Sequence, residues 1–181
     1  MEQKKIAVVV GSLRRESWNR KIAKELIRLA PDSMKLEFVE FGDLPLYNED
    51  LETAEPPKQW AEFRAAISAN DAVIFVTPEY NRTIPGGLKN AIDVGSRPFG
   101  SSVWSGKPAA VVSASTGGVG GFGANHVLRQ SLVFLGMPTL QHEAYIGGVN
   151  KQFDENGALA ESTEKFLRKF LTEYEAWIAR F

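Results

Sequence analysis

The sequence contains no cysteine among its 181 residues. Disulfide bonds, thiolate-bound zinc or iron–sulfur centres and cysteine nucleophiles are therefore excluded. A chain of this length buries about 70% of the surface that its unfolded form exposes, so a hydrophobic core can stabilise it without cross-links. Because most domains have roughly 100–200 residues, we expect a single domain over residues 1–181.

The sequence also lacks an excess of charge and a long hydrophobic run. Lysine and arginine number 21 and aspartate and glutamate 22, which gives a net charge of −1. A nucleic-acid-binding protein would carry a basic patch or stripe, so no nucleic-acid partner is expected. The apolar run at residues 6–10 is shorter than a signal-peptide core of about 7–15 residues or a membrane span of about 20. We therefore expect a cytoplasmic protein that does not bind membranes.

Histidine is scarce as well. His126 and His142 are the only two, and neither lies in a local pattern of metal ligands, so no metal site is expected. The sequence has no G-x-S-x-G element, which disfavours an α/β-hydrolase.

Short apolar runs alternate with longer helical patterns along the chain. Strands are predicted at residues 6–10, 35–41, 72–76, 109–113 and within 139–146. Helices are predicted at residues 18–29, 60–67, 125–135 and 159–178, with another beginning at Pro85. This alternation indicates βαβ units, whose right-handed crossovers build a parallel sheet with helices on both faces. Five strands favour an α/β, flavodoxin-like sheet in the order 2-1-3-4-5.

A sheet of this order binds ligands beyond the carboxyl ends of its strands, at the point where the connections diverge. The loops after the first, third and fourth strands should meet there. We therefore expect these three loops to carry unusual chemistry.

The loop after the first strand, residues 11–19, is suited to a terminal phosphate. Gly11 permits a sharp exit from the strand, and Arg14 supplies a forked cation that matches phosphate oxygens. The following helix directs the positive end of its dipole and its free N–H groups to the same place. An ordinary turn in which Ser17 only caps the helix is the alternative. The candidate ligands are Ser12, Arg14, Ser17, Trp18 and Asn19.

The loop after the third strand, residues 77–87, is stiff and offers flat, apolar and amide surface. Pro78 and Pro85 restrict its backbone, and Tyr80 adds an aromatic ring. Such a loop suits the edge and face of a planar ring, although a rigid connection with an exposed tyrosine is the alternative. The candidate residues are Pro78, Glu79, Tyr80, Asn81 and Ile84.

The loop after the fourth strand, residues 113–123, contains five glycines. Gly118, Gly120 and Gly123 spell G-x-G-x-x-G, but that dinucleotide fingerprint belongs directly after the first strand of a βαβ unit, so we reject it. Exposed backbone N–H groups and hydroxyls instead suit an electron-rich ring edge. The candidate residues are Ser115, Thr116, Gly117 and Gly118.

The three loops together offer one phosphate cradle and one rigid, planar slot. A mononucleotide with a large flat ring fits this combination better than a dinucleotide does. FMN is the natural candidate, because flavodoxin-like sheets bind it at this switch point.

The same residues resemble the NADPH-dependent FMN reductase family and, within it, the chromate and quinone reductases. The most specific stretches are residues 77–81 (TPEYN) and 85–93 (PGGLKNAID). Residues 11–14 (GSLR), 44–48 (LPLYN) and the loop at 115–121 also match, and the resemblance covers nearly the whole chain.

The resemblance implies an FMN enzyme that takes hydride from NADPH or NADH and passes electrons to quinones, chromate or similar oxidised small molecules. Flavin N5 would accept the hydride, so no catalytic side chain is required. The resemblance also implies a homodimer or homotetramer. Two alternatives remain: an FMN reductase that supplies reduced flavin to a partner monooxygenase, and a non-enzymatic flavodoxin-like carrier, which should be more acidic around the flavin.

By resemblance, the first loop holds the FMN phosphate and the other two line the isoalloxazine. We expect N–H groups near Gly117 and Gly118 to stabilise the negative charge that develops at the N1/O2 edge. The sequence departs from the family at residues 98–104, a segment that could shape the substrate mouth. Arg129 and Glu143 are candidates for an ion pair within or between subunits, with a solvated surface as the alternative.

Overall fold

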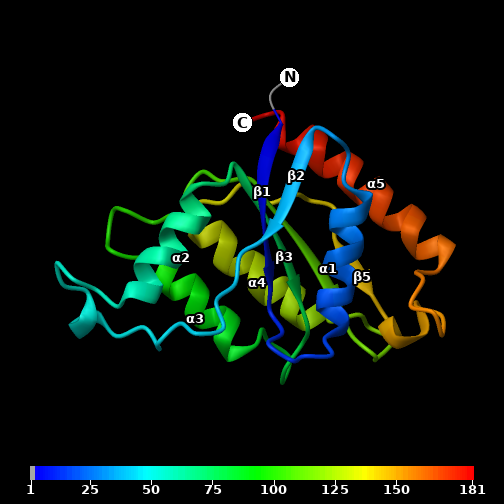
Figure 1. Ribbon diagram of the computed structural model, residues 1–181, viewed down its shortest axis with the longest axis horizontal. Coiled ribbons are helices and arrows are strands. Elements are labelled where there is room, and N and C mark those ends of the chain that lie inside the picture. Colours follow the sequence, from blue (N-terminus) through cyan, green and yellow to red (C-terminus); the bar gives the residue numbers. More distant parts are fainter. Residues whose placement is uncertain (1–2) are drawn as a thin grey trace.

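The structure is a computed structural model that describes residues 3–181 (Figure 1). Its strands are β1 (Lys4–Val10), β2 (Met34–Phe38), β3 (Ala72–Thr77), β4 (Ala109–Ala114) and β5 (Ala144–Ile146). Its helices are α1 (Trp18–Leu29), α2 (Lys58–Ser68), α3 (Gly86–Gly95), α4 (Phe122–Phe134) and α5 (Glu161–Ile178). Two short 3-10 helices are η1 (Glu49–Leu51) and η2 (Val149–Lys151).

The strands form one parallel sheet in the order β2-β1-β3-β4-β5, which confirms the predicted flavodoxin-like fold. Helices α1 and α5 cover one face, and α2, α3 and α4 cover the other (Figure 1). Alternate residues of β1 accordingly enter the two cores: Ile6 and Val8 pack under α1 and α5, and Ala7 and Val9 under the opposite helices. Burial on both faces explains why this strand is a continuous apolar run.

Both ends of α1 are set by local sequence. Ser17 is the N-cap, and its Oγ accepts a hydrogen bond from Arg20 N at 3.1 Å. Pro31 follows the C-cap Ala30 and cannot continue the helix. The helix amino end is thereby held at the carboxyl edge of the sheet, where β1 also ends.

Several element boundaries differ from the sequence prediction by one to three residues, and three of these differences have a clear local cause. β2 ends at Phe38 rather than at residue 41, because Phe41 enters the core from a loop after ladder pairing has stopped. α4 begins at Phe122 rather than at residue 125, since a left-handed Gly121 starts the helix earlier than the apolar pattern does. α5 begins at Glu161, and Leu159 forms an isolated bridge to Phe153 instead of extending the helix.

The segment at 98–104 follows the carboxyl end of α3, which has run back across the sheet from the site edge. Its Trp104 is fully buried, donates to Ile92 O at 2.9 Å and packs against Phe75 with ring centroids 5.7 Å apart. The segment therefore anchors the helical layer, and within one chain it lies away from the loops that follow β1, β3 and β4.

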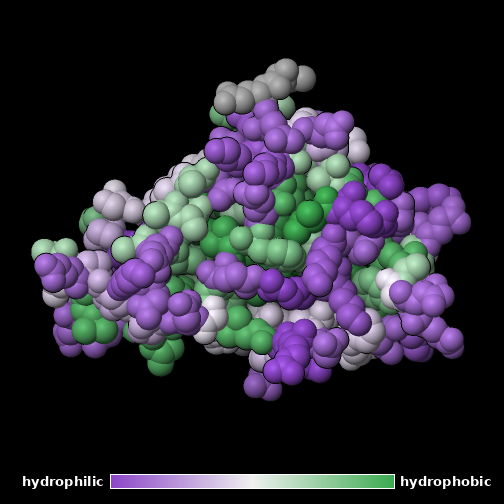
Figure 2. All heavy atoms as spheres, in the orientation of Figure 1, coloured by the Kyte–Doolittle hydropathy of each residue, from purple (hydrophilic) through white to green (hydrophobic). Residues whose placement is uncertain are grey.

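Hydrophilic residues cover much of the side formed by the edge strand β2, with hydrophobic residues between them near the centre of the view (Figure 2). Within residues 3–181, no helix combines the length and apolar character needed to cross a bilayer.

The contact between α3 and Trp104 yields a stability prediction. A Cβ on Gly95 would lie 2.5 Å from Trp104 Cε2, so G95A should lower the free energy of unfolding by about 1–3 kcal/mol through overpacking. G86A in the same helix is the control, because a Cβ there meets nothing within 4 Å. Urea denaturation should show a lower midpoint for G95A alone, and equal midpoints would contradict the proposed tight contact.

Candidate functional site

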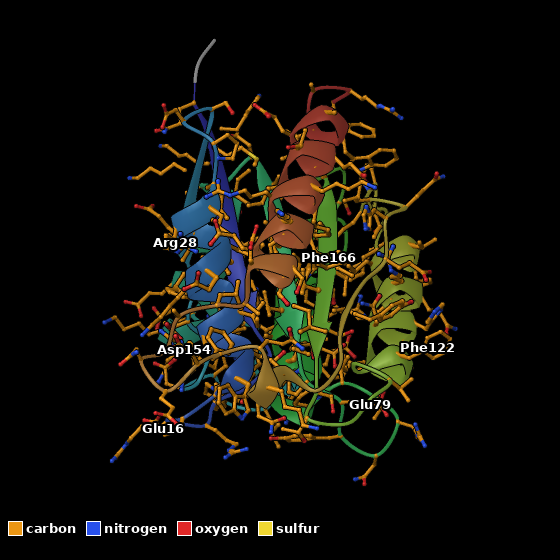
Figure 3. All side chains as sticks on the ribbon, turned by 90° about the vertical axis from the view of Figure 1, so that its right-hand side faces the viewer. Glu16, Arg28, Glu79, Phe122, Asp154 and Phe166 are labelled. Atoms are coloured by element: carbon orange, nitrogen blue, oxygen red, sulfur yellow. The ribbon has the colours of Figure 1, made fainter. Side chains whose placement is uncertain are left out.

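The loops after β1, β3 and β4 meet at one cleft of about 150 Å³. Figure 3 shows this end of the molecule at its lower edge, where Glu16 and Glu79 mark the first and second loops. The structure thus brings together the three loops that are predicted from the sequence to meet at a ligand site. The lining residues are Ser12, Arg14, Ser17, Trp18, Asn19, Pro78, Glu79, Tyr80, Ala114, Ser115, Thr116 and Val149.

The first loop places all five of its predicted residues on the cleft. Ser12, Ser17 and Asn19 are nearly buried, whereas Arg14 is exposed. Ser17 serves as the N-cap of α1, and its hydroxyl hydrogen can still be donated to a ligand. Both interpretations of Ser17 are therefore compatible: it caps the helix and also faces the cleft.

Asn19 ties the first loop to the fourth strand. Its Nδ2 donates to Ala114 O at 3.1 Å, a contact across the sheet that the sequence did not reveal. Its Oδ1 is buried and has no hydrogen-bond partner. An unpaired buried acceptor beside a cleft costs free energy unless a donor reaches it, so this atom marks a place for a ligand hydroxyl or amide.

The second loop contributes Pro78, Glu79 and Tyr80 to the cleft, and Tyr80 is 47% exposed. Asn81 stands in the tight turn that follows, with φ of 49°, and is not among the lining residues. Ile84 is 5% exposed and packs in the core beneath α3, because the chain turns inward before that helix begins. The direction of a side chain in a loop has no periodicity from which it could be predicted.

The third loop contributes Ser115 and Thr116 to the cleft, whereas Gly117 and Gly118, which follow directly, are not among the lining residues. Gly117 N donates to Ser115 Oγ at 3.1 Å, so this predicted donor already has a partner. A Cβ on Gly118 would meet nothing within 4 Å, so the protein leaves open space on that side of the residue.

Two lining residues were missed by sequence reasoning. Ala114 is the last residue of β4, and it lines the cleft because that strand ends at the edge of the sheet where the cleft lies. Val149 begins η2, after β5, and its N–H donates to Ser115 O at 3.0 Å. Because β5 lies beside β4, the loop after β5 reaches the same edge of the sheet. The predicted strand order could therefore have indicated that this loop lines the cleft.

A polar and aromatic cluster borders the third loop on the β5 side. Tyr145 OH donates to Glu143 Oε2 at 2.5 Å and lies 3.0 Å from His126 Nε2, and Phe122 packs on that imidazole at 4.2 Å. Burial, followed by the bond to Glu143, raises the pKa of Tyr145 to about 12. The tyrosine therefore stays a neutral donor through the physiological range of pH.

The candidate pair of Arg129 and Glu143 is not formed within the chain. Arg129 instead donates to Asn125 Oδ1 at 2.8 Å, Leu140 O at 2.7 Å and His142 O at 2.9 Å. Burial lowers the pKa of its guanidinium. In residues 3–181 no group of three or more acidic or histidine side chains is placed to hold a metal ion.

The cleft fits part of a phosphorylated planar ligand. Ligand pockets usually have volumes of about 300–1,000 Å³, so a cleft of about 150 Å³ encloses only a portion and the rest of the ligand would lie along the open loops. A cation and the amino end of α1 are present for a phosphate, and rigid loops border the other side. The fold and the cleft together define a flavodoxin-like mononucleotide-binding protein.

Comparison with known proteins narrows this class. A family model described as NADPH-dependent FMN reductase matches residues 4–151. A quinone reductase of Pseudomonas putida is 61% identical over 174 residues, covering 96% of this chain and 94% of that protein. A 2-hydroxy-1,4-benzoquinone reductase of a Burkholderia species is 44% identical over 176 residues, covering 96% of each. Among solved structures, the flavoenzyme NAD(P)H:(acceptor) oxidoreductase of Paracoccus denitrificans has a TM-score of 0.91 at 40% identity, covering 98% of both chains.

The chain therefore belongs to the NADPH-dependent FMN reductase family. It is an oxidoreductase that uses FMN with NAD(P)H as the electron donor. The resemblance that rested on the loop residues is confirmed.

The exposed arginine of the first loop gives a binding prediction. R14A should weaken FMN binding by the apoprotein about tenfold or more, because a charge-assisted hydrogen bond to phosphate contributes roughly 1.5–3 kcal/mol. The neighbouring R15A is the matched control, since Arg15 is also exposed but does not line the cleft. Titration of apoprotein with FMN, followed by flavin fluorescence, measures both, and equal weakening by the two variants would contradict the assignment.

Proposed function

We propose that this protein reduces quinones with electrons from NADPH or NADH, through an FMN bound in the cleft between the loops after β1, β3 and β4. The observation that carries the proposal is that all five predicted phosphate residues share one cleft at the switch point with five of the predicted ring residues, namely Pro78, Glu79, Tyr80, Ser115 and Thr116. Similarity to proteins named quinone reductases, across nearly the whole chain, supports the choice of acceptor.

The residues of the first loop would bind and orient the phosphate. Arg14 supplies the charge, Ser12 and Ser17 supply hydroxyl donors, and the amino end of α1 adds its partial positive charge. Asn19 would accept a hydrogen bond at its free Oδ1 while its amide stays fixed to β4. These groups hold the ligand at one end and leave the other end at the second and third loops.

The second and third loops would flank the ring. Bound FMN supplies the hydride-accepting and electron-donating chemistry. Pro78 and Tyr80 present a stiff surface on one side, and Ser115 and Thr116 line the other. Asn81 and Ile84 act at most through the shape of the turn, because neither lines the cleft.

Three finer expectations remain predictions. Chromate and similar oxidised metals are further candidate acceptors. Release of reduced flavin to a monooxygenase is the alternative enzyme function, and a cytoplasmic location is the expected setting.

A test of the acceptor follows from the expected retention of FMN. The purified protein should keep its yellow colour through gel filtration and should oxidise NADPH or NADH much faster when a benzoquinone is added. Absorbance of the bound flavin and of the donor measures both properties. Flavin that exchanges freely, with no stimulation by the quinone, would favour the flavin supplier instead.

The proposal includes association of at least two copies through the side formed by α3 and α4. A groove of about 840 Å³ lies there, and Phe99 and Phe134 on its wall are 92% and 89% exposed. Contiguous exposed apolar side chains of this size mark interaction surfaces, and a polar rim with Lys89 and Asp93 suits a specific contact. A homodimer is the smallest such assembly, and a homotetramer would need a second interface.

The oligomer prediction can be tested with one charge at this side. F134D should convert the assembly to smaller species in light scattering after gel filtration, because a buried carboxylate in an apolar contact is costly. F181D is the control, since Phe181 is 65% exposed at the carboxyl end of the chain and does not line the groove. An unchanged mass for F134D would contradict the proposed interface.

A further inference from the structure

One side chain joins the two loops that flank the proposed ring position. Glu79 follows β3, and its Oε2 accepts hydrogen bonds from the backbone N–H groups of Gly123 at 2.7 Å and Ala124 at 3.3 Å. The side chain is only 16% exposed, and Figure 3 shows it at the lower edge of the molecule, close to the start of α4. Its carboxylate is therefore engaged with the end of a helix that belongs to the third loop.

Helix α4 has no N-cap side chain of its own. The first N–H groups of any α-helix lack intrahelical acceptors. Gly121 occupies the N-cap position with φ of 79°, and it has no side chain that could accept from them. Glu79 accepts from Gly123 and Ala124, the second and third residues of the helix, which are the donors that an N-cap side chain normally serves. The cap of α4 thus comes from the loop after β3.

The turn after Glu79 packs on the same helix end. Tyr80 and Thr83 exchange two backbone hydrogen bonds of 2.9 Å, and the two residues between them have φ values of 49° and 65°. Such left-handed conformations cost free energy in non-glycine residues and persist where the surroundings fix them. A Cβ on Gly123 would lie 2.9 Å from the backbone oxygen of Arg82, so the turn and the helix are in direct contact.

We propose that Glu79 is a positioning residue that sets the spacing and the electrostatic potential of the ring site by acting through the amino end of α4. This role rests on the proposed placement of FMN between the second and third loops. By holding the turn against the helix, the side chain fixes how far apart the two loops stand. Its negative charge also offsets the partial positive charge at the helix end.

The charge of Glu79 can be tested separately from its hydrogen bonds. Removing the charge should change the midpoint potential of the bound flavin, which a purely structural cap would not affect. Reduction adds electrons to bound FMN, so a more positive potential at the site favours the reduced form. Glutamine can accept the same hydrogen bond without the charge. We therefore expect E79Q to bind FMN within about twofold of the parent and to raise the midpoint potential of the bound flavin. E79A, which has no acceptor, should bind FMN about tenfold more weakly, a loss of about 1.4 kcal/mol.

The experiment compares the parent, E79Q, E79A and E16Q. Glu16 is an exposed carboxylate in the first loop at the same edge of the molecule, so E16Q removes an equal charge without touching α4 (Figure 3). Apoprotein titrated with FMN gives the affinity, and redox titration of the FMN-loaded protein against indicator dyes gives the midpoint potential. Thermal unfolding, monitored by circular dichroism, shows whether E79A is folded. If E79A is not folded, the result for E79Q alone decides the test.

Each outcome of this experiment has one interpretation. A raised potential in E79Q, with E16Q equal to the parent, supports the role. No shift in E79Q, an equal shift in E16Q, or an unchanged FMN affinity in folded E79A would overturn it. Failure of the parent itself to bind FMN would instead contradict the proposed function.

Discussion

The parallel pairing of β1 with β3 is the constraint on which the rest of the structure depends. Val10 pairs with Val76 at the end of this register, so both strands leave the sheet at the same edge. The chain then turns from β1 towards β2 and from β3 towards β4, and no connection crosses the space between. A cleft opens there without any specialised residue, and the chemistry of the surrounding loops decides what it binds.

The third loop is held at both of its ends. Beyond the start of α4, a fully buried Asn125 donates to Ser113 Oγ at 3.1 Å and to Ala144 O at 3.2 Å. Arg129 extends this network to the segment before β5, where its guanidinium satisfies two backbone carbonyl groups. β5 has only three residues, so these side-chain bonds add to a short ladder. Helix, strand and loop are therefore one connected unit at the edge where the cleft lies.

Local patterns in the sequence were sufficient for the sheet and for most of the cleft. Buried strands read as apolar runs, and strand order followed from the number of strands and the handedness of crossovers. Contacts between distant segments could not be read in this way. The bond from Asn19 to Ala114, the cap that Glu79 supplies to α4 and the inward turn of Ile84 depend on where a loop lies in space. The early start of α4 was hidden because its N-cap is a glycine in the left-handed conformation and not one of the side chains that usually mark a helix start.

The glycines of the loop at 113–123 fall into two kinds, which differ in how much room the structure leaves for a side chain. At Gly120, Gly121 and Gly123 a Cβ would meet neighbouring atoms at about 3 Å, and the first two also have positive φ. Gly117 and Gly118 meet no such obstacle. Only Gly120, Gly121 and Gly123 are required by the packing or the backbone conformation of the fold. The second kind can vary without unfolding the chain, so a library of substitutions at Gly117 and Gly118 could alter ligand preference while leaving the scaffold intact.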